Sequence, residues 1–247
     1  MKIEIKNEKL IYYREFDLNS DIDLSNTDIT SLPNNMKVKG NLILFYTNIE
    51  VLPENLEVNG NLDLSNTEIS SLPESLKVIG GINLYDTEIK ALPDNLQLGG
   101  DLILRFTKIK VLPKNLQVNG NLDLSFTKIK VLPKNLKVGG NLKLSNTDIS
   151  SLPDNMKVNG YLDLSNTDIT SLPENLEVNG NLDLSSIKIT SLPKNLKVNG
   201  DLDLSFTDIS SLPENLKVKG SIDLSNTKIK KENIPKHLID KCNRYEE

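Results

Sequence analysis

His237 and Cys242 are the only histidine and the only cysteine of the chain, and these residue types build a thiol nucleophile and its base. Their spacing near the end of the chain does not predict that the imidazole reaches the thiol. No nucleophile-elbow, phosphate-loop or metal-ligand motif occurs elsewhere in the sequence. The carboxylates recur at regular intervals, which is typical of solvated faces. We therefore expect a protein that is not an enzyme, with no cofactor and no metal site.

The residues that point to a function are large side chains at positions where the sequence otherwise carries small polar ones. Residues 101–110 read DLILRFTKIK, whereas residues 141–150 read NLKLSNTDIS, so Ile103, Arg105 and Phe106 stand out. Aromatic and arginine side chains are enriched at the centres of protein interfaces. The residues that we expect to contact a partner are Ile43, Phe45, Tyr46, Tyr85, Ile103, Arg105, Phe106 and Phe126.

Charge is also segregated along the chain. A stretch rich in glutamate precedes a lysine-rich stretch between residues 101 and 140, whose secondary basic patch consists of Lys108, Lys110, Lys128 and Lys130. Such blocks either steer an acidic partner or set the register of side-by-side assembly, and an ordinary solvated surface is the remaining interpretation. In addition, Asp163, Asp183, Asp203 and Asp223 share one outward column, where we expect solvent to screen their repulsion.

A repeat of 20 residues sets the position of all these side chains. It runs from residue 21 to residue 230 without insertion or deletion, with a consensus close to NLDLSNTxIxSLPxNLxVxG. Ten full units are followed by a half unit, and the glycine at 40 and the proline at 33 recur every twentieth residue. An unbroken period of this length predicts stacked coils that each follow the same path.

Within a unit the apolar residues alternate, as they do from Leu116 to Leu124, which predicts extended chain with one face buried. Gly120 falls on the inward side, where we expect a bend with little room inside it. A bulge or turn at Ser125–Phe126 would let Thr127 and Ile129 point inward again. The threonine column then places its hydroxyl groups inside, where we expect them to bond to the backbone from coil to coil.

The LxL segment followed by a polar residue at fixed spacing resembles a leucine-rich repeat, and the Leu-Pro pair is similar to the short repeats of bacterial effector proteins. The resemblance covers residues 21–230. The chain departs from that pattern in carrying threonine in place of the inward asparagine, and in an extra LxVxG segment that indicates a second strand per coil. We predict a mainly β, single-domain solenoid of stacked 20-residue leucine-rich-repeat-like coils, with an N-terminal β cap at residues 1–20 and a short C-terminal helical cap at residues 231–247.

Composition narrows the classes of protein further. A net charge of −5 argues against a broad nucleic-acid surface, and one cysteine fits a reducing compartment. The start of the chain lacks the apolar core of a signal peptide, and no run approaches the roughly 18 apolar residues of a membrane span. We expect a cytoplasmic protein, with a host cell or a virion as other locations, that is a monomer or self-assembles and binds neither nucleic acid nor membrane.

Two functions follow from the sequence. The first is a non-catalytic protein–protein interaction scaffold that binds an unidentified protein partner through the strand face of the repeats spanning 41–130. The alternative is a structural rod or assembly component of a virion, tail or surface layer, which associates through the charge blocks. An ice-binding face would need the threonine column to lie outward, and the alternation places it inside.

Overall fold

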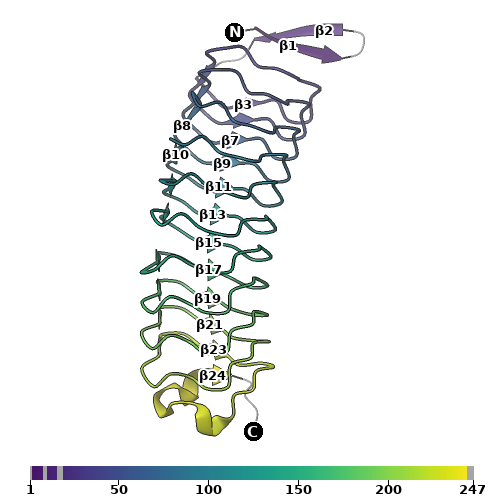
Figure 1. Ribbon diagram of the computed structural model, residues 1–247. Coiled ribbons are helices and arrows are strands. Elements are labelled where there is room, and N and C mark those ends of the chain that lie inside the picture. Colours follow the sequence, from purple (N-terminus) through teal and green to yellow (C-terminus); the bar gives the residue numbers. More distant parts are fainter. Residues whose placement is uncertain (1, 8–9, 16–18, 244–247) are drawn as a thin grey trace. The chain divides into compact units, whose positions relative to one another are not determined.

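The computed structural model describes the backbone of residues 2–7 and 10–15 and the complete residues 19–243. Repeats build two alternating series of two-residue strands (Figure 1). The LxL series comprises β3 (Ile22–Asp23), β5 (Leu42–Ile43), β7 (Leu62–Asp63), β9 (Ile82–Asn83), β11 (Leu102–Ile103), β13 (Leu122–Asp123), β15 (Leu142–Lys143), β17 (Leu162–Asp163), β19 (Leu182–Asp183), β21 (Leu202–Asp203) and β23 (Ile222–Asp223). The LxV series comprises β4 (Lys37–Val38), β6 (Glu57–Val58), β8 (Lys77–Val78), β10 (Gln97–Leu98), β12 (Gln117–Val118), β14 (Lys137–Val138), β16 (Lys157–Val158), β18 (Glu177–Val178), β20 (Lys197–Val198) and β22 (Lys217–Val218).

The chain forms two compact units, which are described separately. The first unit contains residues 1–122 and 135–137, and the second contains residues 123–134 and 138–247. In the first unit, β3, β5, β7, β9 and β11 form one parallel ladder, while β4, β6 and β8 form another. In the second unit the parallel ladders run from β15 to β23 and from β16 to β22. The predicted mainly β solenoid with a second strand in each coil is confirmed.

The ends of the chain add different elements. β1 (Lys2–Asn7) and β2 (Leu10–Glu15) pair with each other as an antiparallel hairpin. Residues 16–18 and the side chains of the hairpin lie outside the described residues, so the capping role of residues 1–20 stays a prediction. At the other end, the 3-10 helices η1 (Lys231–Asn233) and η2 (Lys236–Lys241) are followed by β24 (Cys242–Asn243), which pairs with β23.

The interior of each coil is aliphatic, as the alternation predicts. In the coil of residues 41–60 the buried side chains are Leu42, Leu44, Ile49, Leu52, Leu56 and Val58. Thr47 is buried too, but its hydroxyl donates to the carbonyl oxygen of Leu44 in the same coil at 2.7 Å. The expectation that the threonines link successive coils is therefore wrong. A carbonyl three residues earlier is within reach of the hydroxyl, and the bond closes the turn of its own coil.

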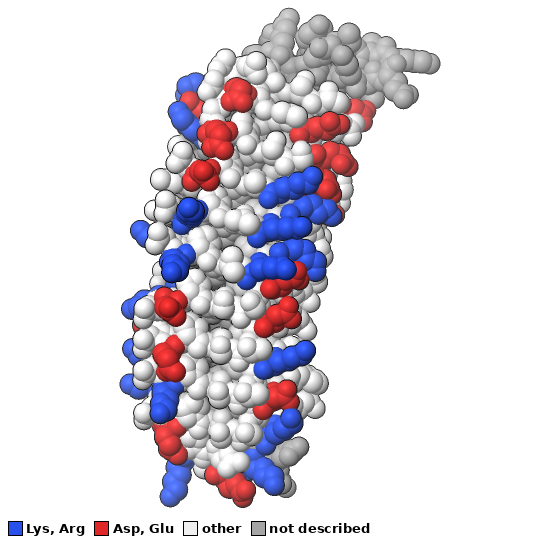
Figure 2. Space-filling view, in the orientation of Figure 1, with Lys and Arg blue, Asp and Glu red and all other residues white. Residues whose placement is uncertain are grey.

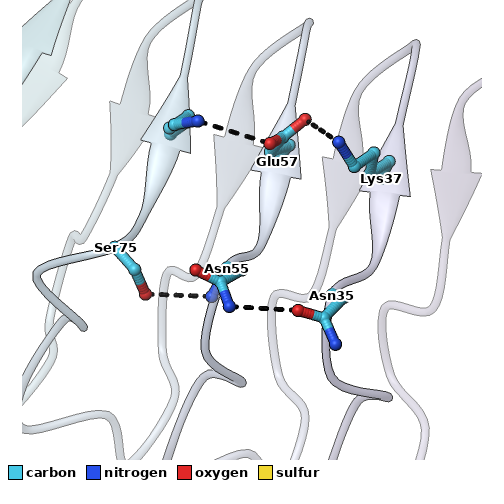
Figure 3. Close-up of polar contacts among 6 residues, drawn as sticks. Asn35, Lys37, Asn55, Glu57 and Ser75 are labelled. Atoms are coloured by element: carbon cyan, nitrogen blue, oxygen red, sulfur yellow. Dashed lines mark hydrogen bonds and ion pairs between the residues drawn. The ribbon is translucent and has the colours of Figure 1, made fainter.

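Other polar side chains do connect successive coils. The Oδ1 atom of Asn41 accepts the backbone N–H of Asn61, and the Oδ1 atom of Asn61 accepts that of Gly81, both at 2.7 Å. A second column joins the amides of Asn35 and Asn55 at 3.0 Å (Figure 3). On β4, β6 and β8, the carboxylate of Glu57 lies 2.9 Å from the Nζ atom of Lys37 and 3.4 Å from that of Lys77 (Figure 3).

The glycine column marks the closest approach between coils. The N–H of Gly60 donates to the carbonyl oxygen of Gly40 at 2.9 Å, and a Cβ atom on Gly60 would lie 2.6 Å from the carbonyl carbon of Gly40. The sequence predicts that a bend inside the coil requires the glycine. The structure shows instead that close contact with the preceding coil requires it. No described glycine has a positive φ, so the glycine is needed for its size and not for its conformational freedom.

We predict that Gly60→Ala lowers the free energy of unfolding by about 1–3 kcal/mol, because the added methyl group overlaps backbone atoms that no rotamer change can move. Urea unfolding followed by circular dichroism measures the loss. The neighbouring exposed Asn59→Ala serves as the control and should change stability by less than about 0.5 kcal/mol. Equal stability of the two variants would contradict the tight stacking.

Asp201 gives a prediction about pH. Its Oδ1 atom accepts the backbone N–H of Ser221 at 2.8 Å and the Ser221 hydroxyl at 2.9 Å, and these bonds lower the pKa of Asp201 below the ordinary value of 3.8. A group of this kind stabilises the fold at pH values above its ordinary pKa. This stabilisation is lost as the pH falls through the lowered pKa. Asp201→Asn keeps an oxygen acceptor but removes the charge, so it should be less stable than the parent at neutral pH and lose less stability on acidification. Urea midpoints at pH 7 and at about pH 2.5 test this, and an identical acid dependence would refute it.

Candidate partner-binding surface

A tight turn follows each strand of the LxL series. In the coil of residues 61–80, the Oδ1 atom of Asp63 accepts the N–H and the hydroxyl of Ser65 at 2.9 and 2.6 Å. The next residue, Asn66, has a φ of 55°, which is the left-handed conformation that asparagine tolerates well. Asp163 and Asp183 hold the same turns in the second unit through the N–H groups of Ser165 and Ser185. The aspartate column is therefore explained by local turn geometry.

Four aromatic residues occupy the left-handed position of this turn: Tyr46, Phe106, Phe126 and Phe206, with φ between 53° and 62°. This conformation costs an ordinary side chain roughly 1–2 kcal/mol, and a bulky ring lacks the local hydrogen bond that offsets the cost for asparagine. Burial does not compensate the cost at Tyr46 and Phe206, whose side chains are 60% and 62% exposed. Strain of this kind typically persists at functional sites.

In the first unit the rings form two contacts. Phe45 and Tyr46 meet edge to face with their centroids 5.9 Å apart, and Tyr85 and Phe106 do so at 5.7 Å. The Cζ atom of Arg105 lies 5.0 Å from the centroid of the Phe106 ring, within the range of a cation–π interaction. These contacts hold the rings in place and leave them partly exposed to solvent.

The structure brings together most of the residues that the sequence predicts, but not all of them. Seven of the eight share the first unit, where Ile43 and Ile103 are half-buried on β5 and β11. Phe126 belongs to the second unit and is 40% exposed. We define the aromatic face by its residues in the first unit: Ile43, Phe45, Tyr46, Tyr85, Ile103, Arg105 and Phe106.

The predicted basic patch is divided in the same way. Lys108 and Lys110 belong to the first unit, and Lys128 and Lys130 to the second. The Nζ atom of Lys108 lies 3.7 Å from Glu88, and that of Lys128 lies 3.2 Å from Asp148. Figure 2 shows acidic and basic side chains in runs along one face. Exposed ion pairs of this kind contribute little stability, but they neutralise part of the charge within the chain.

Exposed valines accompany the aromatic residues, and sequence reasoning missed them. Val51 and Val111 in the first unit are each 66% exposed, and Val131 in the second unit is also exposed. Each follows an aromatic residue of the left-handed position by five residues, where most other coils carry serine. Comparing the repeats column by column reveals this co-occurrence, which has one exception at Phe206 and Ser211. The first unit therefore exposes the apolar side chains of Val51 and Val111 in the same coils as Tyr46 and Phe106.

The reactive side chains are placed unfavourably for chemistry. Cys242 is buried, and burial raises the pKa of its thiol to about 11, so the thiol is protonated at neutral pH. The Nε2 atom of His237 lies 3.3 Å from the carbonyl oxygen of Leu216. The described residues contain no group of three or more His, Cys, Asp or Glu side chains that could hold a metal ion. Within the same part of the chain, no helix has the length and apolar character needed to cross a membrane.

Comparison with solved structures identifies the class of fold. YopM, a leucine-rich effector protein from Yersinia pestis, matches with a TM-score of 0.51 and 18% identity over 87% of this chain and 73% of that one. A leucine-rich repeat protein of Leptospira interrogans matches with a TM-score of 0.47 and 20% identity over 91% of this chain and 83% of that one. The match to YopM shows that the chain has the fold of the leucine-rich repeat proteins. No protein-family model matches it, and comparison with curated proteins gives no match.

Strain at the left-handed position is testable within the second unit. We predict that Phe206→Asn raises the free energy of unfolding by about 1 kcal/mol, because asparagine removes the clash of a bulky side chain at a φ of 58°. The reverse change one coil later, Asn226→Phe at a φ of 56°, should lower it by a similar amount. Urea unfolding measures both. If neither variant differs from the parent, the rings carry no conformational cost.

Proposed function

We propose that the protein is a non-catalytic interaction scaffold whose protein partner binds the aromatic face of the first unit. The observation that carries the proposal is the pair of aromatic residues, Tyr46 and Phe106, held in a conformation that favours asparagine. Both have a neighbouring ring for support and an exposed valine in the same coil. A stability cost next to an exposed apolar surface is typical of a binding site.

The chemistry of this surface fits a protein better than a nucleic acid. Its rings contact one another edge to face, whereas single-stranded nucleic acids stack on open ring faces. Asp63 lies beside Ile43 in the ladder and would repel phosphate groups. A protein partner with apolar side chains would instead contact the aromatic and aliphatic groups of this face, which lie around the polar residues Asp63 and Ser65. Such a composition is common in the core of a protein interface.

Assembly through charge blocks is the weaker alternative. In each unit, charged side chains of neighbouring coils pair with one another, as Lys37, Glu57 and Lys77 do in the first and Lys228 and Asp208 do in the second. Lysines and carboxylates that pair within the chain offer less charge for association between chains. We therefore favour the scaffold over the assembly component.

Affinity capture from extracts of the native cell tests the proposal with three versions of the chain. The double variant Tyr46→Asn with Phe106→Asn inserts the residue that the same column carries in other coils, so the fold is retained. We expect it to lose at least about 30-fold in affinity for the captured protein, as two interface anchors would. Phe206→Asn makes the same chemical change outside the aromatic face and should bind like the parent.

Two results would count against the scaffold. Capture of the same protein by the double variant and the parent would show that the aromatic face is not the binding site. Light scattering at several salt concentrations addresses the alternative, because association through charge blocks weakens as salt screens it. We expect a monomer at every concentration, and salt-sensitive oligomers would favour the assembly component.

A further inference from the structure

The second unit contains a groove along its LxV ladder. Its volume is about 1030 Å³, at the upper end of the range for ligand pockets. One part of its lining comes from β16, β18, β20 and β22, and the other from η2 through His237, Leu238 and Lys241. All of these residues belong to the second unit, so the groove is formed by one compact body.

The lining is strongly basic. Six lysines face two glutamates, and the lysines are Lys157, Lys194, Lys197, Lys217, Lys219 and Lys241. Glu177 pairs with Lys157 at 3.2 Å, which neutralises one lysine at the far end. Lys241 is held in place because its Nζ atom donates to the carbonyl oxygens of Val218 and Lys219, the latter at 3.3 Å. The positive charge therefore gathers towards β22 and η2.

Two of these lysines stand side by side in neighbouring coils. Lys197 and Lys217 are direct partners in the ladder between β20 and β22, where neighbouring strands lie about 4.8 Å apart. Like charges placed directly opposite each other destabilise a sheet. In the first unit the same column begins with Lys37, Glu57 and Lys77, with ion pairs between them, and continues with Gln97, Gln117 and Lys137. Repulsion between Lys197 and Lys217 is relieved when an anionic group binds between them.

The neutral residues of the groove indicate what kind of anion fits. Asn155, Asn175 and Asn195 form a row in which each amide nitrogen donates to the preceding amide oxygen, at 3.3 and 3.5 Å. This row supplies amide groups at about the spacing of the coils, and amides pair well with an extended peptide backbone. Among the described residues that line the groove there is no Phe, Tyr or Trp ring on which successive bases could stack.

We propose that this groove binds an acidic protein segment in an extended conformation. Carboxylates of the segment contact Lys197, Lys217 and Lys219, and its backbone lies along the asparagine row. The site is separate from the aromatic face, and it does not depend on the proposed function. It gives the protein a second recognition surface of opposite chemical character, one apolar and one basic.

Fluorescence anisotropy with a labelled octaglutamate peptide and the full chain tests this site. We expect saturable binding that weakens as salt rises, and no binding of an octaglutamine peptide. The variant Lys217→Gln with Lys219→Asn inserts residues that the same columns carry in other coils, and should weaken binding at least tenfold. The matched control, Lys37→Gln with Lys39→Asn, changes the same two columns in the first unit and should bind like the parent.

Each outcome either supports a groove for acidic peptides or assigns the groove to a different ligand. Urea unfolding should show that Lys217→Gln is at least as stable as the parent, so that a loss of binding is not a loss of fold. Equal weakening by the control variant, or no binding of the acidic peptide, would overturn the proposal. Tighter binding of a single-stranded oligothymidylate would assign the groove to nucleic acid instead. Self-association of the parent that disappears in the Lys217→Gln, Lys219→Asn variant would assign it to a second copy of the chain.

Discussion

Direct backbone contact between successive coils is the constraint on which the other features depend. At the glycine column the N–H of one coil reaches the carbonyl oxygen of the coil before it, and a Cβ atom has no space there. Each coil must therefore repeat the path of its predecessor at this point. An insertion in any coil would shift its glycine out of this column, which accounts for a period of 20 residues without exception from residue 21 to residue 230.

The same constraint divides each repeat into fixed and free positions. Inward leucines and isoleucines fill a narrow interior, and asparagine or aspartate at the first position of the repeat accepts a backbone N–H of the next coil. The side chains that remain lie on columns whose backbone geometry is already set. At such a column, asparagine in one coil and phenylalanine in another have the same φ to within a few degrees, as Asn66 and Phe206 do at 55° and 58°. The residues at these surface columns can therefore differ between coils, and serve binding, without changing the fold.

Much of this architecture follows from the sequence, because the period and the alternation of Leu116 to Leu124 depend only on local spacing. The turn at Ser125–Phe126 follows for the same reason, since the parity of the apolar residues breaks there. The partner of the threonine hydroxyl and the reason for the glycine do not follow, because each depends on which backbone atoms lie nearest in three dimensions. The strain at Phe106 depends on a positive φ angle, which a phenylalanine in the sequence does not predict. The basic groove needs η2 beside the LxV ladder, and no spacing in the sequence predicts that arrangement.

In a repeat protein, each residue that departs from the consensus can be compared with the residues at the same position in the other coils. Ile187 departs from the threonine column, but it is buried, so the change replaces a satisfied hydroxyl by apolar volume in an apolar interior. Such a departure is compatible with stability and needs no function. Tyr46 and Phe106 depart in the opposite sense, because other coils of the same chain carry asparagine in this column, which suits the left-handed conformation better. Departures of the second kind mark the aromatic face as the surface where recognition, and not the fold, determines the residue.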